Sequence, residues 1–404
     1  MPICTIDNIK PGMVLGADLI TPDGRMLLPR GVTLEERHIE LIRKMGISEI
    51  DAWAECTPDQ VDTARIEDYV RDFFLYANPD NPAVLELYRL TLERTGQAVC
   101  NGWELPDTDT RRAVSVEHLD DIFLKGLGGP EQCVSHELEL ESFPDIYFRI
   151  REVLESESGN ADKIAQVVST DVGLSSKLLK LVNSPFYGFP STIDSISRAV
   201  ALVGGNELST LALGVSTISY FKDIPRELVD MRTFWRHSIS CGIFARILAS
   251  EQQGLQSERF FIGGLLHDVG RLIMFKTLPY ASTEAMLFAR ENSIPLVEAE
   301  RETMDFCHTD VSRILMREWK FPESLGEMIN NHHDPMNYPN PLEPAIIHVA
   351  DNMANAMAVA EGGMYVIPGI VDGAWELLGL DPSFMGTALE QYERQIDQIM
   401  DAFF

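Results

Sequence analysis

The sequence predicts a mainly α protein in three parts: a small α+β unit over residues 1–54, an acidic helical connecting region over 55–140, and an all-helical domain over 141–404. From about residue 141 onward, apolar residues recur at helical spacing between short Gly, Pro and Asn breaks. Strand-like stretches are confined to the first part of the chain. With 404 residues, 45% of them hydrophobic, the chain can bury a sizeable core in two or three domains.

The first 54 residues combine strand-like and helical stretches. Two short β-like segments, MVLGADLI and RMLLPR, stand on either side of the turn signal TPDG, and ISEIDAW closes the unit as a further strand. Between them, TLEERHIELIRKMG has helical spacing. Thr33 followed by Glu36 predicts a capping box at the start of this helix, and Gly46 predicts its end.

The connecting region is acidic and is broken by Asn-Pro pairs at 78–79 and 81–82 and by GLGGP at 126–130. We expect helices between these breaks, with the charge run forming a solvated helical face. The pattern leaves three roles open for this region: a dimerisation segment, a spacer, or part of the surface of the main domain.

The formal net charge of −29 argues against nucleic acid and anionic membrane as direct partners, because we find no Lys/Arg-rich stripe that reverses the field locally. No segment has the length and apolarity of a membrane helix, and the N-terminus lacks a leader pattern, so we expect a cytoplasmic protein. The six cysteines are scattered without a CxxC pair, which predicts reduced, mostly structural thiols.

The segment GGLLHDVGRLIMF places His267 and Asp268 inside an apolar run. On one continuous helix, Gly263, Gly264, His267 and Arg271 would share a side, and the glycines would let another backbone come close. Side chains of consecutive residues on a helix point about 100° apart, so both can reach one point beside the helix only if that point is compact, such as a metal ion. Taken alone, the pair is weak evidence for a metal, and a buried histidine bonded to a nearby aspartate is the more ordinary explanation.

Four more histidines and a second aspartate strengthen the metal hypothesis, because they too lie on inward helix faces or at the starts of apolar segments. Seven candidate metal ligands result: His237, His267, Asp268, His308, His332, His333 and Asp351. If the two aspartates converge to ~4 Å, their repulsion is about 4 kcal/mol at an effective dielectric near 20, so a cation or a shared proton must relieve it. Imidazole and carboxylate ligands suit one or two divalent ions of Fe, Mn or Zn.

In chain order, these residues resemble the metal-ligand set of HD-superfamily phosphohydrolases, which include the HD-GYP cyclic di-GMP phosphodiesterases. More specifically, TDVGLSSKLLKLVNSPFYGFPSTIDSISRAVALVGGNEL (170–208) and GLLHDVGRL resemble the HDOD domain, an HD-related output domain of bacterial signalling proteins. The matching motifs run from Ser142 to Asp351, and residues 1–54 resemble a small domain found ahead of such modules. The resemblance implies an all-helical HD-like fold and a role in signal transduction.

The HDOD-like block is also intelligible as structure. Asp171 is placed to cap a helix, and Asn183-Ser184-Pro185 is placed to end it with a turn that binds its carbonyls. This pattern favours packing and loop stabilisation. The alternative is that Asn183, Ser184 and Tyr187 line a surface for a partner or ligand.

The chain departs from the HD-GYP pattern in three places. Arg271 stands where those enzymes carry a lysine, and arginine is not a tunable proton donor. Tyr338-Pro339 is at most a remnant of their Gly-Tyr-Pro motif, and Thr233 stands where some place a glutamate ligand.

Three functions therefore remain open. We favour a regulatory HDOD protein with a retained metal site, acting on a signalling protein partner or a small phosphorylated ligand, with a homodimer as one assembly to test. The alternative is a metal-dependent phosphohydrolase or phosphodiesterase, in which Asp268 bridges two ions and Arg271 neutralises charge on the phosphoryl oxygens. The third is a helical interaction protein without metal, whose histidines are satisfied by hydrogen bonds alone.

Overall fold

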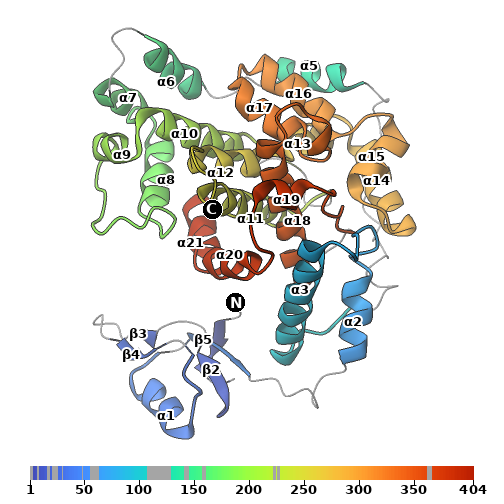
Figure 1. Cartoon of the computed structure of the whole chain (residues 1–404). Coiled ribbons are helices and arrows are strands. Elements are labelled where there is room, and N and C mark those ends of the chain that lie inside the picture. Colours follow the sequence, from blue (N-terminus) through green and yellow to red (C-terminus); the bar gives the residue numbers. More distant parts are fainter. Residues whose placement is uncertain are drawn as a thin grey trace.

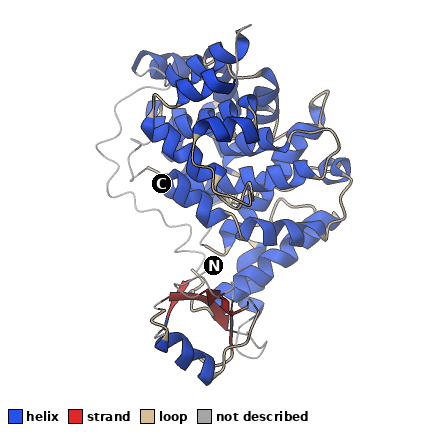
Figure 2. Cartoon of the chain, turned by 90° about the vertical axis from the view of Figure 1, so that its left-hand side faces the viewer, coloured by secondary structure: helices blue, strands red, loops and turns tan. Residues whose placement is uncertain are grey.

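The computed structural model is mainly helical, with a small strand-containing unit at the N-terminal end of the chain (Figure 1). Figure 2 shows the strands gathered at one end of the molecule and helices making up the rest. The structure describes residues 3–6, 9–15, 19–20, 26–29, 31–47, 49–54, 63–106, 129–140, 145–156, 161–221, 224, 228–361 and 366–404. The predicted fold class, mainly α with a small α+β unit at the start, is confirmed.

The N-terminal unit pairs its strands antiparallel around a core of its own. A three-stranded sheet has the order β1-β5-β2, with Val14 opposite Trp53, and β3 pairs separately with β4. The apolar core beneath them includes Leu15, Ile42 and Ile50. The bounds are β1 Ile3–Thr5, β2 Met13–Leu15, β3 Leu19–Ile20, β4 Met26–Leu28, α1 Glu36–Lys44 and β5 Glu49–Ala54.

Helix α1 begins later than the sequence predicts. Thr33 forms a β-bridge with Val14, so the chain is still extended there and the predicted capping box of Thr33 and Glu36 is wrong. Glu35 is the N-cap instead, and its backbone N–H donates to Nδ1 of His38 at 3.1 Å. The predicted end is confirmed, because Gly46 has φ +71°, a conformation that glycine adopts without strain.

The connecting region forms the helices α2 Thr63–Arg71, α3 Pro82–Cys100 and α5 Pro130–Leu140, and the last two begin at predicted Pro breaks. Asn81 caps α3, accepting from the N–H of Ala83 at 2.9 Å. Buried residues of α2 and α3 belong to the same apolar core as the C-terminal helices, and the Tyr69 hydroxyl donates to the carbonyl of Val359 at 3.1 Å. These helices are therefore packed onto the main domain.

One cysteine prediction needs correction. Cys100, the last residue of α3, is disulfide-bonded, whereas we expected reduced thiols throughout. Spacing along a sequence does not show which sulfur atoms meet in space, and no CxxC pattern marks this one. Cys133, Cys241 and Cys307 are free and buried, as expected for structural thiols.

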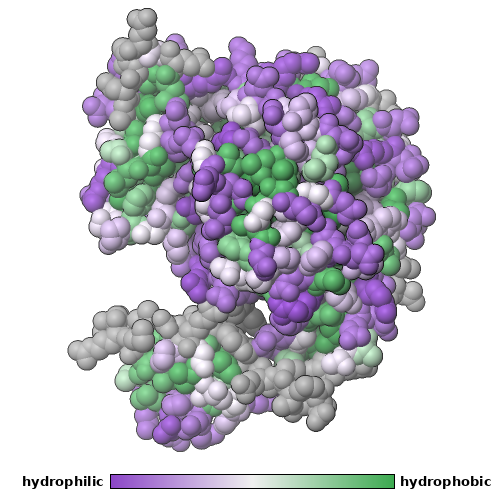
Figure 3. Space-filling model, in the orientation of Figure 1, coloured by the Kyte–Doolittle hydropathy of each residue, from purple (hydrophilic) through white to green (hydrophobic). Residues whose placement is uncertain are grey.

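The remaining helices form one layered body in which α11 and α18 lie next to each other at the centre (Figure 1). Figure 3 shows a mainly hydrophilic face with smaller apolar patches over this body. The bounds are α6 Asp145–Glu155, α7 Ala161–Val168, α8 Val172–Val182, α9 Ile196–Val203, α10 Gly205–Tyr220, α11 Met231–Ser250, α12 Ser257–Leu266, α13 Val269–Thr277 and α14 Pro279–Asn292. The chain continues with α15 Leu296–Met304, α16 His308–Glu318, α17 Glu323–Asn330, η3 Pro335–Asn337, α18 Leu342–Val359, α19 Ala374–Leu378, α20 Phe384–Glu393 and α21 Ile396–Phe403.

Helices α11 and α12 cross at their glycines, as the sequence predicts for the GG pair. A Cβ atom on Gly264 would lie 2.5 Å from the backbone nitrogen of Gly242, closer than any real Cβ contact. Larger residues at either position would push the two helices apart, so the glycines set the distance between them.

Within the described part of the chain, no single helix has the length and apolarity needed to cross a membrane. Helices α9 and α10 reach that length only as a pair, and they meet at a bend of 118°.

Candidate metal centre

The seven predicted ligands come together in the helical body from five separate segments. His237 projects from α11 and Asp351 from α18. His267 and Asp268 occupy the junction between α12 and α13, and His308 is the first residue of α16. The two remaining histidines, His332 and His333, lie in the turn that follows α17.

The junction at His267 and Asp268 corrects the continuous helix that we expected there. Helix α12 ends at Leu266, and Asp268 has φ −100° and ψ 11°, outside the helical region, before α13 begins at Val269. His267 still has helical dihedral angles, φ −55° and ψ −35°, so the helix breaks at Asp268 itself.

The first group of side chains surrounds one oxygen of Asp351. Its Oδ1 lies 3.1 Å from Nε2 of His237 and 3.4 Å from Nε2 of His267. The two Nε2 atoms are 3.3 Å apart, and Oδ2 of Asp268 is 3.4 Å from that of His267. Two carboxylates and two imidazoles therefore face one small volume.

The second group lies on the other side of Asp268. Its Oδ1 is 3.2 Å from Nε2 of His308, which is 3.1 Å from Nε2 of His333. The ligand atoms of His308, His332 and His333 all lie within 4.8 Å of one another. Asp268 thus directs one oxygen toward each group, and His332 connects them, because its ligand atom also lies within 4.8 Å of those of His267 and Asp351.

Hydrogen bonds to the outer ring nitrogens fix the orientation of three imidazoles. Nδ1 of His267 donates to the carbonyl of Gly264 and Nδ1 of His332 to that of Ile329, both at 2.6 Å. Nδ1 of His308 bonds a carboxylate at the same distance. A carbonyl can only accept a hydrogen bond, so a neutral ring in this position carries its proton on Nδ1. Its lone pair is then on Nε2, which points toward the other candidate ligands.

Charge and burial in the centre suit a cation. Burial, followed by the neighbouring His267 and His308, lowers the pKa of His332 to about 3, and burial likewise lowers the pKa of His333 well below its usual value. Burial opposes ionisation of Asp351, but the adjacent His237 and His267 outweigh it and hold its pKa well below its usual value. Burial also lowers the pKa of His267, but the charge of Asp268 outweighs burial and raises that pKa well above its usual value, so a metal bound there would displace a proton from the ring. Neutral imidazoles and ionised carboxylates are the forms that bind metals.

Two polar atoms test whether these residues fit a metal. Nε2 of His332 and Oδ1 of Asp268 are buried and form no hydrogen bond among the described residues, although Oδ1 lies 3.2 Å from Nε2 of His308. Buried polar atoms are rarely left unpaired in folded proteins. A divalent cation between the two groups would satisfy both atoms, so the donor set fits one.

Sequence reasoning missed Glu300, which supports the centre from α15. Its side chain is buried and bonds both Arg271, through Nε at 2.7 Å, and His308, through Nδ1 at 2.6 Å. A signal was present, because Val297, Glu300 and Met304 are spaced by three and four and all three are buried. An acidic residue on an otherwise apolar helix face indicates that its carboxylate has a buried hydrogen-bond or ion-pair partner.

Arg271, predicted as a catalytic residue, lies at the edge of the centre. Its guanidinium bonds Oδ2 of Asp268 through Nη1 and Oε1 of Glu300 through Nε. Two of its three nitrogens are thereby directed at carboxylates of the protein itself.

The three residues predicted to form a ligand or partner surface are engaged by their own loop. Asn183 donates to the carbonyls of Leu179 and Ile193, both at 2.8 Å, and accepts from the N–H of Ile193 at 2.7 Å. Ser184 donates to Leu181 and is buried, and the Tyr187 ring lies in contact with neighbouring aromatic rings. Their contacts match the loop-stabilising interpretation of this block, and the predicted caps Asp171 and Asn183 are observed.

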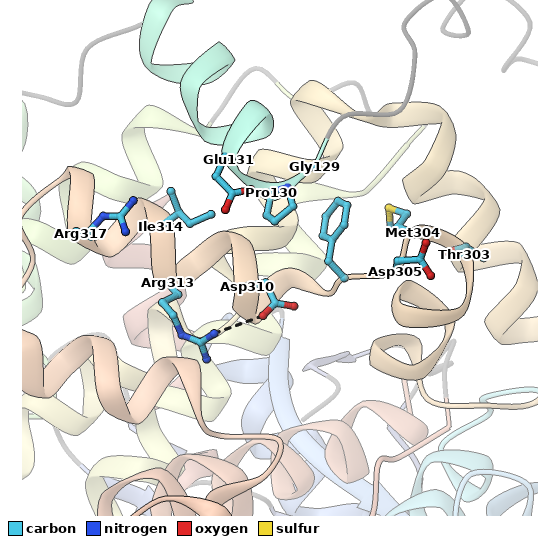
Figure 4. Close-up of a pocket in the computed structure, with 11 residues that line it drawn as sticks. Gly129, Pro130, Glu131, Thr303, Met304, Asp305, Asp310, Arg313, Ile314 and Arg317 are labelled. Carbon is cyan, nitrogen blue, oxygen red and sulfur yellow. Dashed lines mark hydrogen bonds and ion pairs between the residues drawn. The ribbon is translucent and has the colours of Figure 1, made fainter.

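A separate cavity of about 780 Å³ lies outside the histidine centre, between the start of α5, the end of α15 and the outer face of α16 (Figure 4). Asp310 and Arg313, which form an ion pair at 3.4 Å, line one wall, and Glu131 and Phe306 line others. None of the seven candidate ligands lines it. The cavity and the centre are therefore distinct features.

Comparison with known proteins matches residues 140–335 to the HDOD domain family. A protein of Treponema pallidum, itself uncharacterised, is 26% identical over 272 residues, which cover 66% of this chain and 49% of that relative, so the chain spans about half of its length.

Solved structures show the same fold. An HDOD domain protein from Geobacter sulfurreducens has a TM-score of 0.56 at 22% identity, over 68% of this chain and 97% of its own. A candidate phosphohydrolase from Shewanella amazonensis SB2B has a TM-score of 0.54 at 19% identity, covering 68% and 100%. A candidate signal transduction protein from Marinobacter aquaeolei VT8 has a TM-score of 0.55 at 17% identity, covering 100% and 95%. Residues 140–335 of this chain therefore match the HDOD domain, and its helical fold is similar to that of these solved structures.

Proposed function

We propose that the chain is a regulatory HDOD protein in which a divalent metal, Fe, Mn or Zn, joins five segments of the helical body. The convergence of histidine Nε2 atoms on Asp268 and Asp351 carries this proposal. Without a cation, the neighbouring imidazoles and carboxylates, which lie 3.1–3.4 Å apart, would have to share protons to keep their lone pairs from facing each other. A metal that binds only the folded state stabilises it, so its binding free energy becomes folding free energy.

The position of Arg271 favours regulation over turnover. A guanidinium that assists phosphoryl transfer must contact oxygens on which charge develops. Here Asp268 and Glu300 already bind two of the nitrogens of this side chain, which is largely buried. The protein therefore uses Arg271 to neutralise its own acids, and we propose that the output of the domain is a contact with a signalling protein partner.

A metal-dependent phosphohydrolase is the second candidate, and one observation favours it. Asp268 stands between two groups of histidines with one oxygen toward each, which is the arrangement of a ligand shared by two ions. His237, His267 and Asp351 would complete one position, and the remaining three histidines the other. When bound, a pair of such ions would hold a phosphate and lower the pKa of water between them.

Elemental analysis of the purified protein, together with turnover assays on cyclic di-GMP, cyclic mononucleotides and a generic phosphodiester, tests both proposals. Bound metal without turnover supports the regulatory function. Turnover that disappears in Asp268→Ala would instead establish the hydrolase. A metal-free protein whose stability is unchanged by Asp268→Ala would overturn both.

A further inference from the structure

Glu300 occupies a position where three hydrogen-bond donors of the centre meet. Oε2 accepts from Nδ1 of His308 at 2.6 Å and from its backbone N–H at 3.1 Å, while Oε1 accepts from Nε of Arg271 at 2.7 Å. The side chain is almost fully buried, so water does not substitute for these contacts. One oxygen of the carboxylate therefore binds His308, and the other binds Arg271.

The contact with His308 determines which ring nitrogen faces the centre. An acceptor at Nδ1 keeps the proton on that nitrogen and leaves the Nε2 lone pair 3.2 Å from Oδ1 of Asp268. The second bond, to the backbone N–H at the start of α16, fixes the position of the residue as well as the orientation of its ring.

The contact with Arg271 acts on the other side of the same aspartate. With Nε bound to Glu300, the guanidinium is held so that Nη1 reaches Oδ2 of Asp268. One buried carboxylate thus places both neighbours of Asp268, His308 at Oδ1 and Arg271 at Oδ2.

We propose that Glu300 is a positioning residue of the metal centre, which sets metal affinity by orienting His308 and by holding Arg271 against Asp268. This inference rests on the proposed metal binding. It extends that proposal because Glu300 lies on α15, which supplies none of the seven candidate ligands.

The substitution Glu300→Gln tests the idea with almost no change in size. Glutamine offers one acceptor oxygen and one NH₂ group, whereas the site presents donors on both sides. Either orientation directs the NH₂ group at an N–H donor, so one of the two neighbours loses its bond. Outer partners of metal-binding histidines typically contribute 10- to 100-fold to metal affinity.

The experiment measures the Zn²⁺ dissociation constant by competition with a chelating dye. We expect Glu300→Gln to weaken binding about 10- to 100-fold. The matched control is Glu298→Gln on the same helix. The side chain of Glu298 is exposed and, among the described residues, forms an ion pair only with Arg301, at 3.0 Å. This control should bind Zn²⁺ like the wild type.

A double-mutant cycle separates positioning from a general loss of structure. If Glu300 acts through His308 and Arg271, the loss caused by Glu300→Gln should shrink to less than about threefold in a background that carries both His308→Ala and Arg271→Ala. An equal loss in both backgrounds, or wild-type affinity in Glu300→Gln, overturns the proposal. If the glutamine variant does not fold, the same cycle is run with Glu300→Asp, which keeps the charge but withdraws the oxygens from His308. A wild-type protein that binds none of Zn²⁺, Mn²⁺ and Fe²⁺ would instead refute the proposed function.

Discussion

The crossing of α11 and α12 gives the most direct test of how the fold positions the centre. In Gly264→Ala, the new Cβ would lie 2.5 Å from N and 2.6 Å from Cα of Gly242, and both are backbone atoms that cannot rotate away. Ordinary contacts begin near 3.4 Å, so the helices must separate by about 1 Å. Overpacking of this kind costs about 1–3 kcal/mol, and we expect about 2 kcal/mol here.

This separation should also weaken metal binding, because His237 lies on α11 and His267 directly follows α12. Thermal unfolding followed by circular dichroism should show a midpoint lower by roughly 5 °C in the presence of a chelator. The control is Gly386→Ala in α20, where a Cβ meets nothing within 4 Å and the better helix propensity of alanine should raise stability by up to about 1 kcal/mol. If the Gly264 variant melts and binds metal like the wild type, the close crossing is refuted.

Three further predictions concern the centre and the loop beside it. In the wild type, metal present at 100 times its dissociation constant should add about 2.7 kcal/mol to the free energy of unfolding, and chelation should remove this contribution and lower the unfolding midpoint. Asp351→Ala should lose most of this dependence on the chelator. Gly270→Ala should be more damaging than the change at the helix crossing, because its Cβ would lie 2.0 Å from the carbonyl oxygen of His308; metal content and yield of folded protein check this. Asn183→Ala should cost about 1–3 kcal/mol through its lost hydrogen bonds, and limited proteolysis should then cut the 183–193 loop faster while metal content stays unchanged.

The elements of the fold were predictable where local chemistry decides them. Asn81 and Pro82 start a helix because the asparagine caps it and proline suits its first position, and both act through neighbours in sequence. Thr33 failed as a cap because a distant residue, Val14, uses its backbone in a β-bridge. The disulfide at Cys100 was missed for the same reason, since it depends on which atoms meet in space.

The candidate ligands were predictable because helical periodicity shows which polar residues face inward. His237 and Asp351 each lie on a helix face that is otherwise apolar, and that contrast is visible in sequence. Periodicity did not predict the break at Asp268, because the surrounding residues favour a continuous helix.

The role of Arg271 depends on a residue that no motif includes. From sequence, a cation three residues after the His-Asp pair is a candidate for binding phosphoryl oxygens. In the structure, Glu300 accepts a hydrogen bond from the same guanidinium and holds it against Asp268, although it lies 29 residues later in the chain. A buried arginine held between two carboxylates leaves that position only if two ion pairs are broken in a medium of low dielectric, which is costly. The choice between regulation and turnover therefore depends on Glu300 as much as on the metal ligands.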